Sequence, residues 1–315
     1  MAKKKKNQEN LPEGMSRRQA KLAARAAERA KLQKDPRPYD GFAMEADLIA
    51  LQEFVPSAHF TADVKGTDRT VRIVTVLPGA VAALVRSEED SNGSNGAVEA
   101  LVALQTQRRG DNPNRDLAYK LNWAINAKPG ESLDTGIADG SEPALTDLLD
   151  QDMDEPITVA QDFNWWLTED QRDNPQVVAT LQQANDSVLP SEKVAAEING
   201  VAWWINPSEK AHIRWVRQEK EADLLNVLAR LHAAGELNLG EGSKFAGVFR
   251  THGVLVPVWD LDNTKDADDW AAGLEALDKK FAEKLAAEAD GSAPELTSDE
   301  HKAKQTIVSR QVTIR

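Results

Sequence analysis

Two carboxylates at the end of an apolar run are the side chains with the clearest potential for catalysis. The run Val254–Trp259 is followed by Asp260, Asp262 and Thr264 in an Asp-x-Asp-x-Thr arrangement. Two neighbouring carboxylates can divide the roles of nucleophile and general acid or base between them. Thiol chemistry is excluded, because the 315-residue chain has no cysteine, and its five histidines are scattered along the sequence.

The arrangement Asp260–Thr264 resembles the nucleophile motif of the haloacid-dehalogenase phosphatases, in which the first aspartate attacks phosphorus. That resemblance implies a long Rossmann-like segment after the strand, which would supply a Ser or Thr, a Lys and further acids. Only 51 residues follow Thr264, and their pattern predicts helices. We therefore interpret the segment as a hairpin strand with an acidic exit, and we predict no catalytic residue, no metal ligand and no cofactor.

The strongest functional signal is a segregation of charge. Residues 1–38 hold 12 Lys and Arg against four acids, whereas residues 39–315 hold 26 against 47 and carry a net charge of −21. Ser16 can cap a helix over residues 17–34, which ends at Asp35-Pro36 because proline cannot continue a helix. The basic residues that we predict to contact the phosphates of RNA are Lys3, Lys4, Lys5, Lys6, Arg17, Arg18, Lys21, Arg25 and Arg29.

Four of these residues, Arg18, Lys21, Arg25 and Arg29, follow one another at spacings of three, four and four, so they form one stripe on the predicted helix. No aromatic residue interleaves them, which favours contacts to the phosphate backbone over recognition of bases. Two other interpretations remain open: a solvated tail, or an arm folded onto its own acidic body. Binding to a membrane surface is disfavoured, because the helix has only two large apolar residues.

Eight tryptophans include two adjacent pairs, Trp165-Trp166 and Trp203-Trp204. Adjacent residues of a strand face opposite sides, so one member of each pair is expected in a core and the other on a second layer or a surface. Packing inside the protein is one interpretation of these pairs. An aromatic surface that binds a protein partner is the other, and it would make the chain a chaperone or adaptor.

Helical and strand patterns alternate along the chain, which predicts an α+β fold. The two predicted α+β units share the order helix, strands, helix, which raises the possibility of an internal duplication. Breaks at proline, glycine and acidic clusters divide the chain into a basic arm, disordered then helical, at 1–38, a first α+β unit at 39–130, an acidic linker at 131–156, a second α+β unit at 157–262 and C-terminal helices at 263–315.

Local signals predict several individual elements. Asn199-Gly200 and His252-Gly253 each indicate the turn of a hairpin. Thr297 and Glu300 form a capping box for a last helix. Apolar side chains point to both faces of the strand predicted over residues 254–259, so we expect this strand to be covered on both sides.

No targeting signal is predicted. The oligolysine at residues 3–6 is followed by polar residues, whereas a secretory signal would continue with an apolar run. No stretch approaches the roughly 18 apolar residues that are needed to span a bilayer. We therefore expect a cytoplasmic protein.

Stretches along nearly the whole body carry a resemblance to a known family, among them EFVP at 53–56, RWV at 214–216, GVFR at 247–250 and VPVWDL at 256–261. On these residues the chain resembles a family of actinobacterial cytoplasmic proteins of undetermined function. Its members often carry labels such as preprotein-translocase-related protein or topoisomerase, but the sequence has no ATPase loop and no topoisomerase tyrosine context. The predicted units are also loosely similar to secretion-chaperone-like folds of actinobacteria.

These observations favour a non-enzymatic cytoplasmic α+β protein that contacts RNA or the ribosome through its basic arm. The alternative is a chaperone or adaptor that binds a protein partner through an aromatic surface of the body. A phosphatase is the third hypothesis, and it would require Asp260 and Asp262 to lie together in a cleft beside a lysine.

Overall fold

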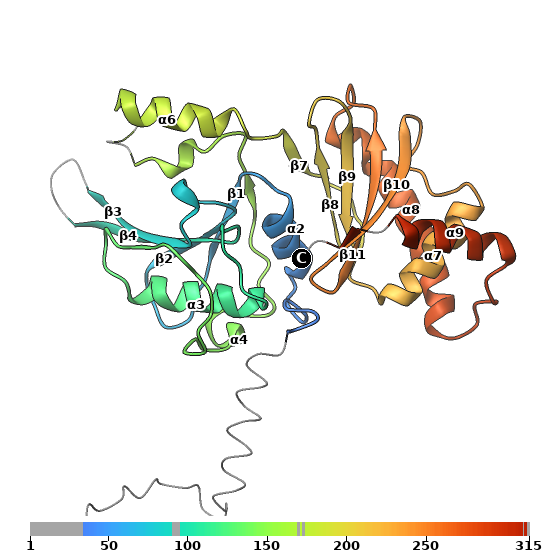
Figure 1. Ribbon diagram of the computed structural model, residues 1–315, viewed down its shortest axis with the longest axis horizontal. Helices are drawn as coiled ribbons and strands as arrows, with labels where there is room; N and C mark the ends of the chain where they lie inside the picture. The colour runs from blue at the N-terminus through green and yellow to red at the C-terminus, as the bar shows by residue number, and fades with distance from the viewer. Residues whose placement is uncertain (1–33, 90–94, 169–170, 172–173, 311, 314–315) are drawn as a thin grey trace, which may run out of the picture. The chain divides into compact units, whose positions relative to one another are not determined.

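The computed structural model describes residues 34–89, 95–168, 171, 174–310 and 312–313. The helices and strands of the described residues lie within Pro36–Arg315, here called the body (Figure 1). Residues 36–38, which the sequence assigned to the arm, therefore belong to the body. The reason is Arg37, whose Nε and Nη2 each donate to the buried carboxylate of Glu45 at 2.6 Å.

The body is an α+β structure, as the sequence predicts, with two six-stranded mixed sheets. The first sheet has the strand order β5-β3-β4-β2-β1-β6, and the second has the order β12-β10-β11-β9-β8-β7. The strands of the first sheet are β1 (Ala58–Ala62), β2 (Thr70–Val74), β3 (Ala83–Glu89), β4 (Asn95–Ala103), β5 (Ser132–Leu133) and β6 (Thr158–Val159). The strands of the second sheet are β7 (Ser191–Lys193), β8 (Val201–Ile205), β9 (Ala211–Val216), β10 (Ser243–Thr251), β11 (Val254–Leu261) and β12 (Val312–Thr313).

The helices pack on these sheets in separate groups. The core of the first sheet includes side chains of α2 (Glu45–Glu53), α3 (Pro113–Asn126) and α4 (Leu145–Leu148). The core on one face of the second sheet includes side chains of α7 (Glu221–Ala233), the 3-10 turn η3 (Ala267–Trp270), α8 (Ala271–Ala289) and α9 (Ser298–Ser309). A further helix, α6 (Pro175–Asn185), lies beside the 3-10 turn η2 (Asn164–Trp166).

The two sheets share a strand order but not a chain path. The row β3-β4-β2-β1 of the first sheet corresponds to the row β10-β11-β9-β8 of the second. At the centre of these rows β2 and β4 are parallel, whereas β9 and β11 are antiparallel. The helix α3 follows β4, but α7 lies between β9 and β10. The resemblance between the two halves therefore does not extend to strand direction or to the position of the helix.

Residues 131–156, where the sequence predicted an acidic linker, pack onto the first sheet. β5 pairs with β3, and α4 contacts α3. Leu145, Leu148 and Leu149 are buried in the first core. These three leucines supply the apolar area that holds an otherwise acidic segment in place.

The hairpin predicted at His252-Gly253 is confirmed. β10 and β11 are antiparallel, and the two turn residues have φ values of 46° and 81°, as a type I′ turn requires. The capping box predicted for the last helix is also confirmed, because the Thr297 hydroxyl accepts from the Glu300 backbone N–H and the Glu300 carboxylate accepts from the Thr297 N–H.

The segment around Asn199-Gly200 is a longer loop than the predicted hairpin turn. β7 ends at Lys193 and β8 begins at Val201, so residues 194–200 connect the two strands. The Asn199 backbone N–H donates to the Asp278 carboxylate of α8 at 3.1 Å, which ties the loop to that helix. A Cβ atom at Gly200 would lie 2.0 Å from the carbonyl oxygen of Val216, so the close approach of the loop to β9 requires glycine.

The strand β11 is buried on both faces, as its sequence predicts. Leu255, Trp259 and Leu261 enter the core beneath α7 and α8, whereas Val254 and Val256 enter the core of the first sheet. One face of the second sheet therefore contributes to the first core, and the two sheets share buried apolar area.

The helix α2 lies where the two sheets meet and contacts β8 and β9 (Figure 1). Two polar side-chain contacts join it to the second half of the chain. The Asp47 carboxylate lies 2.8 Å from the Lys193 ammonium, and the Glu53 carboxylate lies 2.8 Å from Nε2 of His252, in the hairpin turn. The turn predicted from His252 therefore also serves as a contact between the halves.

Candidate functional site

The basic residues that the sequence assigns to RNA binding lie outside the described residues. This set consists of Lys3, Lys4, Lys5, Lys6, Arg17, Arg18, Lys21, Arg25 and Arg29. Their contact with RNA stays a prediction. Two hollows of the body, by contrast, have linings that include many described residues.

Asp260 and Asp262 make separate contacts. The Asp260 carboxylate lies 3.3 Å from the Lys210 ammonium and 3.2 Å from Nδ1 of His212. The Asp262 carboxylate accepts hydrogen bonds from the backbone N–H and the hydroxyl of Thr264, at 3.0 and 2.7 Å, and these bonds lower the pKa of Asp262. Asp260 lines a pocket on the second sheet, and Asp262 is not among the residues that line it.

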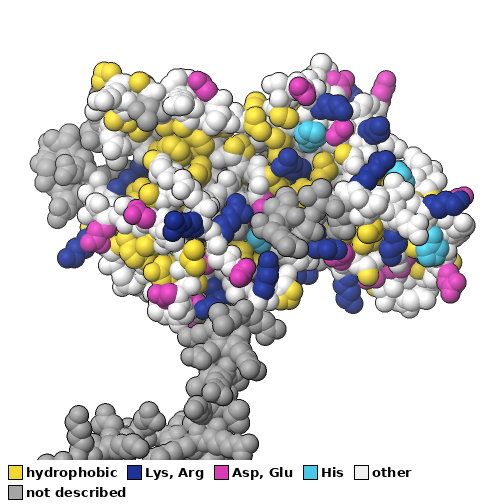
Figure 2. Space-filling view, viewed as in Figure 1, with side chains coloured by type: hydrophobic (Ala, Val, Ile, Leu, Met, Phe, Trp, Pro, Cys, Tyr) yellow, Lys and Arg dark blue, Asp and Glu magenta, His cyan; other side chains and the backbone are white. Residues whose placement is uncertain are grey.

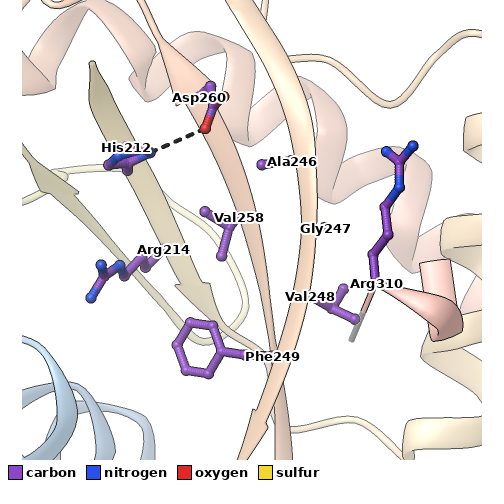
Figure 3. A pocket seen from close by; sticks show the side chains of 9 residues that line it. All are labelled: His212, Arg214, Ala246, Gly247, Val248, Phe249, Val258, Asp260 and Arg310. Carbon is purple, nitrogen blue, oxygen red and sulfur yellow. Dashed lines mark ion pairs between the residues drawn. The ribbon is translucent and has the colours of Figure 1, made fainter. Parts of the chain in front are cut away.

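This pocket, here called the sheet-face pocket, has a volume of about 350 Å³. Ile213 and Trp215 of β9 enter the core beneath α7 and α8, so their neighbours on the strand point to the opposite face, where the pocket lies. Strand register places Arg214 opposite Val258. The lining residues come from β9, β10, β11 and the end of α9 (Figure 3): His212, Arg214, Ala246, Gly247, Val248, Phe249, Val258, Asp260 and Arg310.

Arg214 is the unusual group of the sheet-face pocket. Its guanidinium carbon lies 5.3 Å from the centre of the Phe54 ring. Burial lowers the pKa of Arg214 below its ordinary value. Within the part of the chain that the structure describes, no carboxylate pairs with this guanidinium and no oxygen accepts its hydrogen bonds. Because a guanidinium has five N–H donors, Arg214 can bind an anion.

The other ionisable groups of the pocket leave a positive excess. Burial lowers the pKa of His212. The negative charge of Asp260 raises this pKa, and the positive charges of Arg214 and Lys210 lower it further. His212 is therefore neutral near pH 7. Among the described residues of the lining, the single negative charge is on Asp260, which already has the Lys210 ammonium beside it. Arg214 and Arg310 remain as the positive charges of the lining, at opposite ends of it in Figure 3.

A second hollow, here called the α6 groove, lies between η2 and α6 and has a volume of about 570 Å³. It is lined by uncharged residues: Asn164, Trp165, Leu167, Val178, Leu181, Gln182 and Asn185. Val178 is 43% exposed, and among the described side chains of α6 only Leu181 is buried. Figure 2 shows hydrophobic side chains gathered in this part of the surface.

Hydrogen bonds hold the indole of Trp165, which lines the α6 groove, and that of its neighbour Trp166 in place. Trp165 Nε1 donates to the Ser57 hydroxyl and Trp166 Nε1 donates to the Val76 carbonyl, each at 3.0 Å. The Trp166 ring stacks on Phe163 with centroids 4.2 Å apart. Both indoles nevertheless remain partly exposed. They are fixed in position and available for contact with another molecule.

The second tryptophan pair is structural. Trp203 enters the core of the first sheet, and Trp204 enters the core beneath α7 and α8. Both are buried, and their opposite directions follow from strand alternation in β8. The two pairs in the sequence therefore have different roles, because η2 is a 3-10 turn and β8 is a strand.

Sequence reasoning missed the sheet-face pocket. A signal was present in β9, whose sequence AHIRWV alternates polar and apolar side chains. That alternation predicts one polar face, but it gives no information on which strands lie beside it. The sequence signal for the α6 groove was weaker. It consisted of Val178, an apolar residue in a predicted helix for which the sequence indicated no packing partner.

Two other kinds of site are absent from the described part of the chain. No group of three or more His, Asp or Glu side chains there is arranged to hold a metal ion. No helix there has the length and apolar character needed to cross a membrane.

The geometry defines an α+β protein with two mixed sheets, a cationic pocket on one sheet and an uncharged groove beside η2. Residues 38–315 match the model of a family of unknown function, DUF5926, and the chain belongs to this family. The match starts close to Pro36, where the body begins. No curated protein and no solved structure matches the chain.

Proposed function

We propose that this protein is a non-catalytic cytoplasmic adaptor that holds an apolar segment of a partner protein in the α6 groove. The observation that carries the proposal is an aromatic hollow whose described lining is uncharged. Trp165 and Leu167 are partly exposed, and Val178 is 43% exposed. Apolar hollows at a protein surface mark sites of ligand or protein docking.

The lining indicates the chemistry of the partner segment. Residues 39–315 carry a net charge of −21, but the described residues that line the groove are uncharged. An apolar side chain of the partner would bury area against Trp165 and Val178. The amide groups of Gln182 and Asn185 at the same groove suit hydrogen bonds to a peptide backbone.

The loose packing of α6 supports the same function. Leu181 is the one buried side chain among those described on this helix. A shift of α6 would therefore expose little apolar area that is now buried. The groove can therefore widen around a bulky side chain while the anchored indoles stay in place.

Photo-cross-linking tests the adaptor function. A benzoylphenylalanine placed at Val178 should form a cross-link to one defined protein in cells. The same group at Gln183, which is exposed on α6 and outside the groove lining, should not. Purified partner should then bind the V178E variant at least about tenfold more weakly, whereas Q183E should bind normally. Identical cross-links from the two positions, or full binding by V178E, would contradict the proposal.

The charge segregation favours a second function, in which the basic arm binds RNA, most directly that of the ribosome. Residues 1–38 hold 12 basic residues against four acids. The acidic body repels a polyanion, so binding would depend on the arm. The resemblance to actinobacterial cytoplasmic proteins is consistent with a protein that carries out either function in the cytoplasm.

The salt dependence of RNA affinity tests this second function. Each phosphate contact should add about 0.7–0.9 to the slope of log affinity against log salt. The double variant R25E/R29E should lose binding, while a matched K279E/K302E variant, altered at exposed lysines of α8 and α9, should retain it. Absence of RNA affinity at low salt, or equal binding by R25E/R29E, would leave the adaptor function alone.

A further inference from the structure

We propose that the sheet-face pocket binds a small organic carboxylate. The Arg214 guanidinium pairs with the carboxylate, and the apolar floor formed by Phe249 and Val258 receives the alkyl or aryl part of the ligand. The described lining of this pocket has no residue in common with that of the α6 groove. Ligand binding here would therefore be a property separate from the proposed adaptor function.

The fold creates a cation that lacks a counter-ion. Cross-strand pairing places Trp203 on one side of Arg214 and Val258 on the other, and neither side chain can accept a hydrogen bond. The ring of Phe54 lies against the guanidinium. Arg214 stays partly exposed, so an anion can reach it, and a carboxylate would form charge-assisted hydrogen bonds with the guanidinium.

The nearby carboxylate does not fill this role. Asp260 belongs to the next cross-strand pair, opposite His212, and lies beside the Lys210 ammonium. Arg310, at the end of α9, adds a second positive charge at the far end of the lining (Figure 3). The pocket is therefore locally cationic on an acidic body, which favours entry of an anion.

The size and floor of the pocket favour a small ligand with an apolar part. Its volume of about 350 Å³ is at the lower end of ligand pockets, which span roughly 300–1,000 Å³. A β-bulge between Phe245 and Gly247 bends β10 at the pocket. The space beside Gly247 is open, because a Cβ atom built there would meet no heavy atom within 4 Å. The apolar floor differs from a phosphate cradle, which relies on converging backbone N–H groups.

Calorimetric titration of the full chain tests the proposed chemistry. The probes are 3-phenylpropionate and hexanoate, each compared with its neutral carboxamide and with inorganic phosphate. Both carboxylates should bind, and each carboxamide should bind about tenfold or more weakly because it cannot form the charged pair. Equal affinity of acid and amide, tighter binding of phosphate, or no binding of either carboxylate would overturn the proposal.

Two substitutions assign the binding to Arg214. R214L should weaken carboxylate binding about tenfold or more while the melting temperature stays equal or rises, because an unpaired charge is removed. V258E should also abolish binding, since it places an internal carboxylate directly across from Arg214. The control K279Q removes a positive charge from the exposed side of α8 and should bind like the wild type. Normal binding by R214L or by V258E would refute the assignment.

Discussion

Deleting residues 1–35 and deleting residues 1–38 should have different effects on stability, although the two truncations differ by only three residues. The longer deletion removes Arg37, whose Nε and Nη2 each donate to the Glu45 carboxylate at 2.6 Å. The Glu45 side chain is only 2% exposed. The shorter deletion keeps this pair, and it removes a segment with little apolar area to bury, so its stability should match that of the full chain.

The expected magnitude follows from the surroundings of Glu45. Removing one partner of a buried ion pair costs about 3–5 kcal/mol. Two features reduce this cost: Arg37 is 29% exposed, and Gln218 Nε2 still donates to the Glu45 carboxylate at 2.9 Å. We therefore expect a loss of about 2–3 kcal/mol for the longer deletion, near the range for hydrogen bonds to charged groups. At this chain size the melting temperature should fall by roughly 4–12 °C.

Urea unfolding of the two truncated proteins measures the difference in free energy of unfolding. A double-mutant cycle in the full chain then isolates the pair, with the variants R37Q, E45Q and R37Q/E45Q. The coupling free energy should be at least about 1 kcal/mol, because the two side chains are in direct contact. Equal stability of the two truncations, or a coupling free energy near zero, would show that Arg37 contributes nothing to the stability of the body and would refute the reasoning.

Two further predictions concern Trp259, in the core of the second sheet, and His59, in the first sheet. W259A should lose about 3–5 kcal/mol of stability, because Trp259 is fully buried and packs 6.1 Å from the Trp215 ring; near-normal urea unfolding would contradict this. His59 should titrate with a pKa of about 4 in NMR spectra, because burial and then the charge of Arg72 lower it. The unfolded chain, in which His59 has a pKa of about 6.5, binds more protons between these values, so the contribution of His59 to stability falls as pH drops from about 6.5 to about 4. H59Q should reduce this pH dependence, and a folded-state pKa near 6.5 would show that the imidazole is solvated.

Several elements were predictable from the sequence because their signals are local. The capping box of Thr297 and Glu300 involves backbone groups within one helical turn. The His252-Gly253 turn depends on two backbone conformations and on the strands that flank it. The double-faced burial of β11 follows from a run in which both alternating positions are apolar. Such signals act over a few residues, so the rest of the fold does not alter them.

The α6 groove was only partly predictable. The sequence marked Trp165-Trp166 as a pair that could lie at a surface, but it treated the pair as part of a strand. The structure places both indoles in the 3-10 turn η2, where the alternation of strands does not apply, and fixes them through Ser57 and Val76. The hydrogen-bond partners are about 100 residues away along the chain, beyond the reach of any local pattern.

The alternation of side chains along the chain is enough to show that β9 has one apolar and one polar face and that β11 is apolar on both. That these two strands are neighbours, with Arg214 opposite Val258, follows from the folded structure alone. The folded structure also decided that Arg310, from the end of α9, lies at the same pocket. The physical reason is that side-chain periodicity fixes which face of an element is buried, whereas strand order and register depend on how all apolar faces of the chain can be covered at once.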